Sequence, residues 1–147
     1  MRRRALLALG ILLFLAITLV VARFLTQEGA ERNAINDLLR AQAAGDATKM
    51  LAALDAGCGA DADCRAKVEK DARELERDGE PKIISLRSET SYALGAATGT
   101  TRVAWTVLGD SLPVVQCVEV RRGGNALTGR TVTLLAISTP IGNESSC

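Results

Sequence analysis

An uninterrupted apolar stretch near the N-terminus constrains this chain more than any other feature. Residues 5–22 are 18 consecutive uncharged residues, 12 of them Leu, Ile, Val or Phe, and they follow Arg2, Arg3 and Arg4. As a helix this stretch is about 27 Å long, and about 31 Å if it continues to residue 25, which matches the hydrocarbon core of a bilayer. The sequence therefore predicts a transmembrane anchor over residues 1–25.

The charges beside this stretch predict its orientation. Three arginines precede it, and only Arg23 follows directly, so the positive-inside rule places the N-terminus in the cytoplasm. The chain is then a single-pass protein of the cell membrane, with a signal anchor and an extracytoplasmic domain. The alternative is a secreted protein whose signal peptide is cleaved after Val20-Val21-Ala22, but the apolar stretch is longer than the usual signal core. Both interpretations place the remaining residues outside the cytoplasm.

The rest of the chain divides into a short linker, residues 26–29, and one domain, residues 30–147. Residues 26–147 carry 14 basic and 17 acidic side chains, a balance that disfavours nucleic acid as a partner. The chain has no histidine, which removes the commonest general base and the commonest metal ligand. Both phenylalanines lie in the anchor, so the core of the domain must consist mainly of Leu, Val, Ile and Ala.

Helical periodicity characterises the first half of the domain. Apolar residues recur at helical spacing in three segments, about 30–44, 46–56 and 61–78. Gly45 ends the first segment and Asp46 can cap the second, while Asp61 or Asp63 can cap the third. We therefore expect three helices, the third with a solvated charged face.

Strand-like alternation characterises the second half. Four strands are predicted over residues 83–86, 101–108, 114–121 and 127–138. Residues 95–99 are expected to form a loop, and residues 109–113 and 122–125 to form turns that join the last three strands into an antiparallel meander. Helices followed by strands indicate an α+β class, with the helices on one side of the sheet.

The first two predicted helices are joined by the phrase Leu39-Arg40-Ala41-Gln42-Ala43-Ala44-Gly45-Asp46-Ala47. This phrase, together with the order of elements, resembles the nuclear-transport-factor-two-like (cystatin-like) α+β cone. The resemblance covers residues 30–140 and extends to short bacterial proteins that carry one membrane anchor and such a domain outside. It implies three helices packed on a bent, four-stranded antiparallel sheet, and an extracytoplasmic location. It implies no activity.

Four cysteines, Cys58, Cys64, Cys117 and Cys147, lie in the part of the chain predicted to be outside, where disulfides persist. Their spacing suits neither a zinc site nor a Cys-x-x-Cys redox pair. Gly57 and Gly59 let the chain turn back at Cys58, so Cys58 is expected to pair with Cys64. Cys117 then remains for Cys147, a bridge that would tie the polar C-terminal tail to the sheet.

No constellation of residues predicts catalysis, and no cofactor or metal site is expected. Enzymes of the resembled superfamily project Asp, Tyr and often His into the cone, and this sequence departs from that pattern. Glu119 and Tyr92 are the residues that could replace them, but neither has a neighbouring base. Trp105, in the middle of a strand, is expected in the core rather than in contact with a ligand.

Two functions remain as hypotheses. The first is a non-catalytic anchored module that binds a protein partner, an envelope component or a small apolar ligand in the concave face of its sheet. The second is an enzyme that uses carboxylates in the same cone. The lining of the cone discriminates between them, because an enzyme needs an open, titratable pocket.

Overall fold

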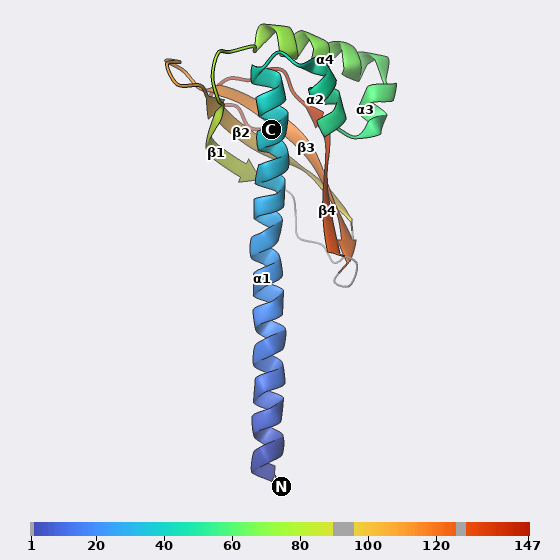
Figure 1. Ribbon diagram of the computed structural model, residues 1–147, viewed down its shortest axis with the longest axis vertical. Helices are drawn as coiled ribbons and strands as arrows, with labels where there is room; N and C mark the ends of the chain where they lie inside the picture. Colours follow the sequence, from blue (N-terminus) through green and yellow to red (C-terminus); the bar gives the residue numbers. More distant parts are fainter. Residues whose placement is uncertain (1, 90–95, 126–128) are drawn as a thin grey trace.

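The computed structural model describes the backbone of residues 2–89, 96–125 and 129–147, and all of their side chains except those of residues 2–8, 20, 22–28, 125, 129 and 130. The elements follow in the order α1 (Arg2–Ala43), α2 (Ala47–Ala53), α3 (Ala56–Ala60), α4 (Ala62–Glu74), β1 (Lys82–Ser88), β2 (Ala97–Thr106), β3 (Val114–Asn125) and β4 (Gly129–Ile137). Helices precede strands, which confirms the predicted α+β class (Figure 1).

Helix α1 runs without a break from the N-terminal segment into the domain (Figure 1). Residues 26–29, expected as a linker, are helical, because Gln and Glu are good helix formers and one glycine costs a helix only about 1 kcal/mol. Large apolar side chains between residues 9 and 21 are 50–67% exposed. Among the residues whose side chains are described, no helix has the length and apolar character needed to span a membrane.

Helices α2, α3 and α4 follow in short succession. Gly45 (φ +67°) ends the turn after α1, and the Asp46 carboxylate caps α2 by accepting a hydrogen bond from Lys49 N at 2.9 Å. The second predicted helix ends at residue 53, because the chain is extended at residues 54 and 55 and Leu54 forms a parallel bridge with Leu134 of β4. Helix α3, which follows it, was not predicted. Helix α4 ends at residue 74, four residues earlier than predicted, and Leu75 is its C-cap.

The four strands form an antiparallel meander in the order β1-β2-β3-β4. The meander of the last three strands was predicted, and β1 extends it. Two expected connections are strand instead. Ala97 pairs with Arg122, so residues 97–99 belong to β2 and residues 122–125 to β3. Local glycine content suggested irregular structure there, whereas pairing with the neighbouring strand decides the conformation. The predicted turn at 109–113 is present, with Gly109 at φ +107°.

The core lies between the helices and one face of the sheet. On β2 and β3 this face carries Val103, Trp105 and Val118, each 0% exposed, as the sequence alternation predicts. Helix α1 contributes Ile35, Leu38 and Leu39 to the same cluster, α2 contributes Met50, and α4 contributes Val68 and Ala72. The single apolar cluster makes helices and sheet one folded unit.

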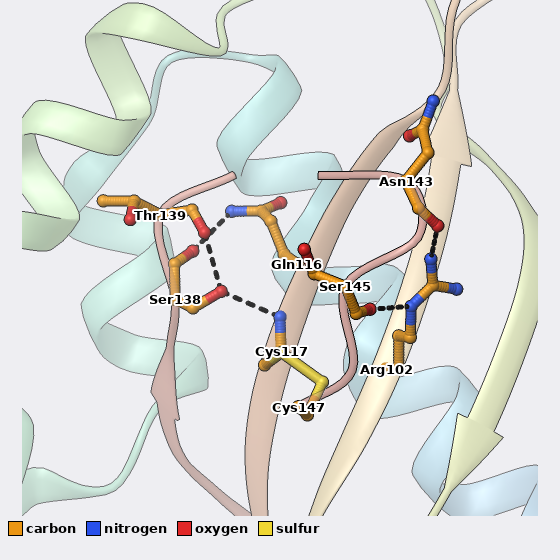
Figure 2. Close-up of a disulfide and its surroundings, with 8 residues drawn as sticks. All are labelled: Arg102, Gln116, Cys117, Ser138, Thr139, Asn143, Ser145 and Cys147. Atoms are coloured by element: carbon orange, nitrogen blue, oxygen red, sulfur yellow. Dashed lines mark hydrogen bonds between the residues drawn. A yellow bond between two sulfur atoms is a disulfide. The ribbon is translucent and has the colours of Figure 1, made fainter. Parts of the chain in front are cut away.

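The C-terminal tail covers part of the other face of the sheet (Figure 2). The Arg102 guanidinium donates hydrogen bonds to the carbonyl oxygens of Asn143 and Ser145, the second at 3.0 Å. Ile141 N donates to Val115 O at 2.8 Å, and Val115 is 2% exposed. The disulfide between Cys117 and Cys147 fastens the end of the tail to β3.

Candidate functional site

Among the described residues, the space between the helices and the sheet, where a ligand or substrate was expected, holds buried side chains of the chain itself. Trp105 stands at its centre with 0% exposure, and its indole N–H donates a hydrogen bond to Gln116 Oε1 at 2.8 Å. The Gln116 amide in turn donates to Ser138 O at 2.9 Å. Trp105 is therefore a core residue whose one polar atom is satisfied, in agreement with the sequence-based expectation.

A buried polar cluster joins α1 to the sheet at the end of the core. The Arg122 guanidinium donates to Glu31 Oε2 through Nη2 at 2.5 Å and through Nε at 2.9 Å. The Thr101 hydroxyl donates to Glu31 Oε1 at 2.6 Å, and Ser88 Oγ accepts from Arg122 at 2.9 Å. Glu31 and Thr101 are 1% and 0% exposed. Both carboxylate oxygens already accept hydrogen bonds, so the cluster acts as a clasp between helix and sheet rather than as an open acid or base.

Sequence reasoning missed both charged members of this clasp. Arg122 was assigned to a turn, although it continues the alternation of Val118 and Val120 on the inner face of β3. Glu31 is not among the candidate residues of the sequence analysis, although it lies four residues before Ile35 on the same helical stripe. Extending the two apolar patterns by one step would have placed these residues on facing surfaces.

The two residues considered for catalysis are not brought together in the interior. Glu119 is exposed on β3 and alternates with buried Val118 and Val120, so it lies on the sheet face opposite the helices. Tyr92 lies outside the described residues. The described part of the chain contains no group of His, Cys, Asp and Glu residues that could hold a metal ion.

Two further polar side chains are buried without hydrogen-bond partners among the described residues. They are Gln42 on α1 and Asp71 on α4, each 0% exposed. Burial raises the pKa of the Asp71 carboxyl above its ordinary value, and the nearby charge of Glu74 raises it further, while Lys67 and Lys70 oppose the shift. Such groups cost stability, because their lost hydration is not replaced.

Two open grooves run along the outside of α1, where the chain passes from α4 to β1. The first, of about 440 Å³, is lined by Arg32, Asn33, Asn36, Glu80, Pro81, Lys82 and Ile83. The second, of about 470 Å³, is lined by Arg40, Ala43, Ala44, Glu76, Arg77, Asp78, Gly79, Glu80 and Pro81. Arg40 pairs with Glu80 at 2.5 Å between them. These shallow, polar grooves are separate from the cone.

The cysteines are joined as Cys58–Cys64 and Cys117–Cys147, the two pairs predicted from the sequence, and the described residues include no free cysteine. Two disulfides are typical of a protein that matures in an oxidising compartment outside the cytoplasm or is secreted.

The arrangement of helices and antiparallel sheet is compatible with the cystatin-like fold that the sequence resembles. Comparison of the chain with models of known protein families, with characterised proteins and with solved structures finds no match.

Proposed function

We propose that the chain is a membrane-anchored extracytoplasmic module that binds a protein partner of the cell envelope and has no catalytic activity of its own. The observation that supports this proposal is the buried cluster of side chains between the helices and the sheet. Val103, Trp105 and Val118 are 0% exposed, so the concave face offers no described cavity for a substrate or an apolar ligand. Binding then takes place on the outer surface of the domain.

The proposed anchor is the N-terminal part of α1. Nine large apolar side chains between Leu9 and Val21 are at least half exposed, and none of them belongs to the core of the domain. A stretch so apolar on every side of a helix is stable only when lipid or protein surrounds it. The arginines at positions 2–4 favour a cytoplasmic N-terminus, and the two disulfides favour an oxidising location for the domain.

The surface that we assign to the protein partner is the turn after β2. Leu108 is 100% exposed and Leu112 is 70% exposed. Asp110 N donates to Val107 O at 3.1 Å, and the Asp110 carboxylate lies 3.8 Å from Arg77 Nε. Exposed apolar side chains gathered on one turn that is held in place suit a protein contact.

Co-purification from detergent-solubilised membranes tests this function. The expected result is one or more envelope proteins that co-purify with the natural chain and are lost from the double variant Leu108→Ser, Leu112→Ser. The matched control is Ile84→Ser, which removes another exposed apolar side chain, on β1. Equal recovery from all three chains would refute the assigned surface, and a turnover activity abolished by Glu119→Gln would support the enzyme instead.

The anchor is tested separately by extraction of membranes with alkaline carbonate. A retained transmembrane helix keeps the protein in the pellet. A soluble form that begins at Arg23 would show that the N-terminal segment is a cleaved signal peptide.

A further inference from the structure

The two grooves beside α1 form one continuous track. They share Glu80 and Pro81, and their walls are the outer side of α1 and the segment that joins α4 to β1. Figure 1 shows this segment passing the C-terminal part of α1. The first groove meets α1 at residues 32–36 and the second at residues 40–44. The track therefore follows α1 from residue 32 to its end at residue 43, a length of about 17 Å.

The first groove carries positive charge. Arg32 of α1 and Lys82 of β1 line it from opposite walls, and both are exposed. Within the described part of the chain, neither side chain forms an ion pair or a hydrogen bond. The amides of Asn33 and Asn36 lie in the same groove and can also donate hydrogen bonds. This end of the track suits a carboxylate.

The second groove carries negative charge. Glu76 and Asp78 line it, and their carboxylates have no ion pair or hydrogen bond with any described residue. Arg77 lies between them in the sequence, but its guanidinium is engaged elsewhere. It donates to the carbonyl oxygens of Glu74 and Glu76, and its Nε lies 3.8 Å from the Asp110 carboxylate. This end of the track suits an ammonium or guanidinium group.

The spacing of the two charged ends indicates what can occupy the track. Between them, Arg40 and Glu80 neutralise each other at 2.5 Å. The parts of α1 that line the two grooves are centred eight residues apart, which corresponds to about 12 Å. An extended peptide covers about 12–13 Å in four residues, and side chains four residues apart point to the same side. An extended segment with opposite charges four residues apart therefore matches the track.

The track begins beside the turn that we assign to the protein partner. Asp110 of this turn is the residue that faces Arg77. Gly79, which lines the second groove, packs against Val107, since a Cβ on Gly79 would lie 2.7 Å from a methyl carbon of Val107. Leu108, 100% exposed, follows directly. One partner can therefore contact the turn and the track together.

We propose that the protein partner lays an extended segment in this track, with an acidic and a basic side chain four residues apart. The acidic side chain binds Arg32 and Lys82, and the basic side chain binds Glu76 and Asp78. The inference rests on the proposed function, because it names the chemistry by which the same partner is recognised. Charge complementarity of this kind selects a partner more than it adds affinity.

Peptide titrations of the full chain in zwitterionic micelles, followed by nuclear magnetic resonance at low ionic strength, test this proposal. The probe is acetyl-Ser-Glu-Thr-Ser-Thr-Lys-Ser-amide. The matched control is acetyl-Ser-Thr-Ser-Glu-Lys-Thr-Ser-amide, which has the same composition but adjacent charges. The probe should shift the side-chain amides of Asn33 and Asn36 and the backbone amide of Gly79, and should bind about threefold more tightly than the control, because it can form one more exposed ion pair. Equal affinity of the two peptides would overturn the proposal.

Charge reversal supplies a second test. In the variant Arg32→Glu, Lys82→Glu, the preference for the probe should be lost, and a peptide with Lys in place of the Glu of the probe should bind better than the probe itself. The matched control is Arg73→Glu, Arg87→Glu, which makes the same change in net charge at exposed residues outside the track and should keep the preference. If both double variants behave alike, the proposal is wrong.

Two further outcomes separate this proposal from its neighbours. Sodium acetate that shifts Asn33 and Asn36 with the same affinity as the probe would show a site for small carboxylates and overturn the peptide track. Absence of a peptide preference, while co-purification still depends on Leu108 and Leu112, would overturn the track and leave the proposed function intact. An intact peptide preference with equal recovery in the co-purification would support the track and refute the assigned turn alone.

Discussion

Replacement of Asp71 by alanine should stabilise the protein, because the native carboxylate is buried with no partner. Both of its oxygens are shielded from water and lack a hydrogen bond among the described residues. An unsatisfied buried polar group costs about 1–3 kcal/mol, and Asp is about 0.5 kcal/mol less favourable than Ala inside a helix such as α4. The small void left by the missing carboxyl offsets about 1 kcal/mol of this gain. The net expectation is about 1–2 kcal/mol of added stability at pH 7.

The pH dependence of this gain has a definite sign. Burial raises the pKa of Asp71 in the folded protein, so between the ordinary and the raised pKa the folded state binds more protons than the unfolded state. Stability of the natural chain then falls as pH rises through that window, and the penalty is complete above the raised pKa. The gain from Asp71→Ala should therefore be larger at pH 7 than at pH 3, which lies below the ordinary carboxyl value of 3.8.

Urea unfolding of the full chain in detergent micelles measures both effects. The midpoint for Asp71→Ala should lie roughly 0.5–1 M above that of the natural chain at pH 7. Glu74→Ala, which removes an exposed carboxylate from the same helix, is the control and should change stability by less than about 0.5 kcal/mol. A less stable Asp71→Ala protein, or a gain that is the same at pH 3 and pH 7, would refute the reasoning.

Three other perturbations have expected outcomes. Arg122→Ala should destabilise the domain by about 3–5 kcal/mol, because Glu31 would keep its buried charge without a partner; chemical denaturation measures this. Loss of the Cys117–Cys147 bridge should cost about 3.7 kcal/mol in the loop-entropy model, and loss of the Cys58–Cys64 bridge about 2.4 kcal/mol, because the closed loops hold 31 and 7 residues. Thermal melting of serine variants tests whether the first loss is the larger. Gly79→Ala should cost about 1–3 kcal/mol, because φ is +124° there and a Cβ would lie 2.7 Å from a side-chain carbon of Val107.

Matched controls accompany two of these variants. Arg121→Ala removes an exposed arginine from the neighbouring position, whose ion pair with Asp55 at 3.3 Å should contribute at most about 1 kcal/mol. Gly59→Ala adds a Cβ in open space and should be neutral or slightly stabilising. Similar losses in Arg121→Ala and Arg122→Ala would contradict the role of the clasp, and a larger loss from Cys58 than from Cys117 would contradict the loop-length argument.

The sequence predicts those features that depend on local pattern. The alternation around Val103 and Trp105 identified the inner face of β2, and the glycines beside Cys58 together with the chain lengths identified both disulfide pairs. The strand alternation and the Cys58–Cys64 pair can be recognised within a few residues of sequence. The Cys117–Cys147 pair follows because these are the two cysteines that remain.

The features that escaped prediction depend on contacts between distant segments. Residues 122–125 contain two glycines and look like a turn. They are strand because all four pair with β4, Arg122 also pairs with Ala97 of β2, and Arg122 binds Glu31, 91 residues away in the chain. Helix α3 was missed because Gly57 and Gly59 give it low intrinsic propensity, and it contains Cys58, whose disulfide to Cys64 ties it to α4. Local propensity is a weak guide where such a tertiary contact competes with it.

The fluorescence of Trp105 reports on the sheet separately from the long helix α1. It is the only tryptophan of the 147 residues, and it lies fully buried between β3 and the helices, with its indole N–H bonded to Gln116. Its emission therefore reports the packing of the sheet, whereas far-ultraviolet circular dichroism is dominated by the 42 residues of α1. Followed together in one melt, the two signals separate loss of the domain from loss of the long helix, a distinction that either signal alone would hide.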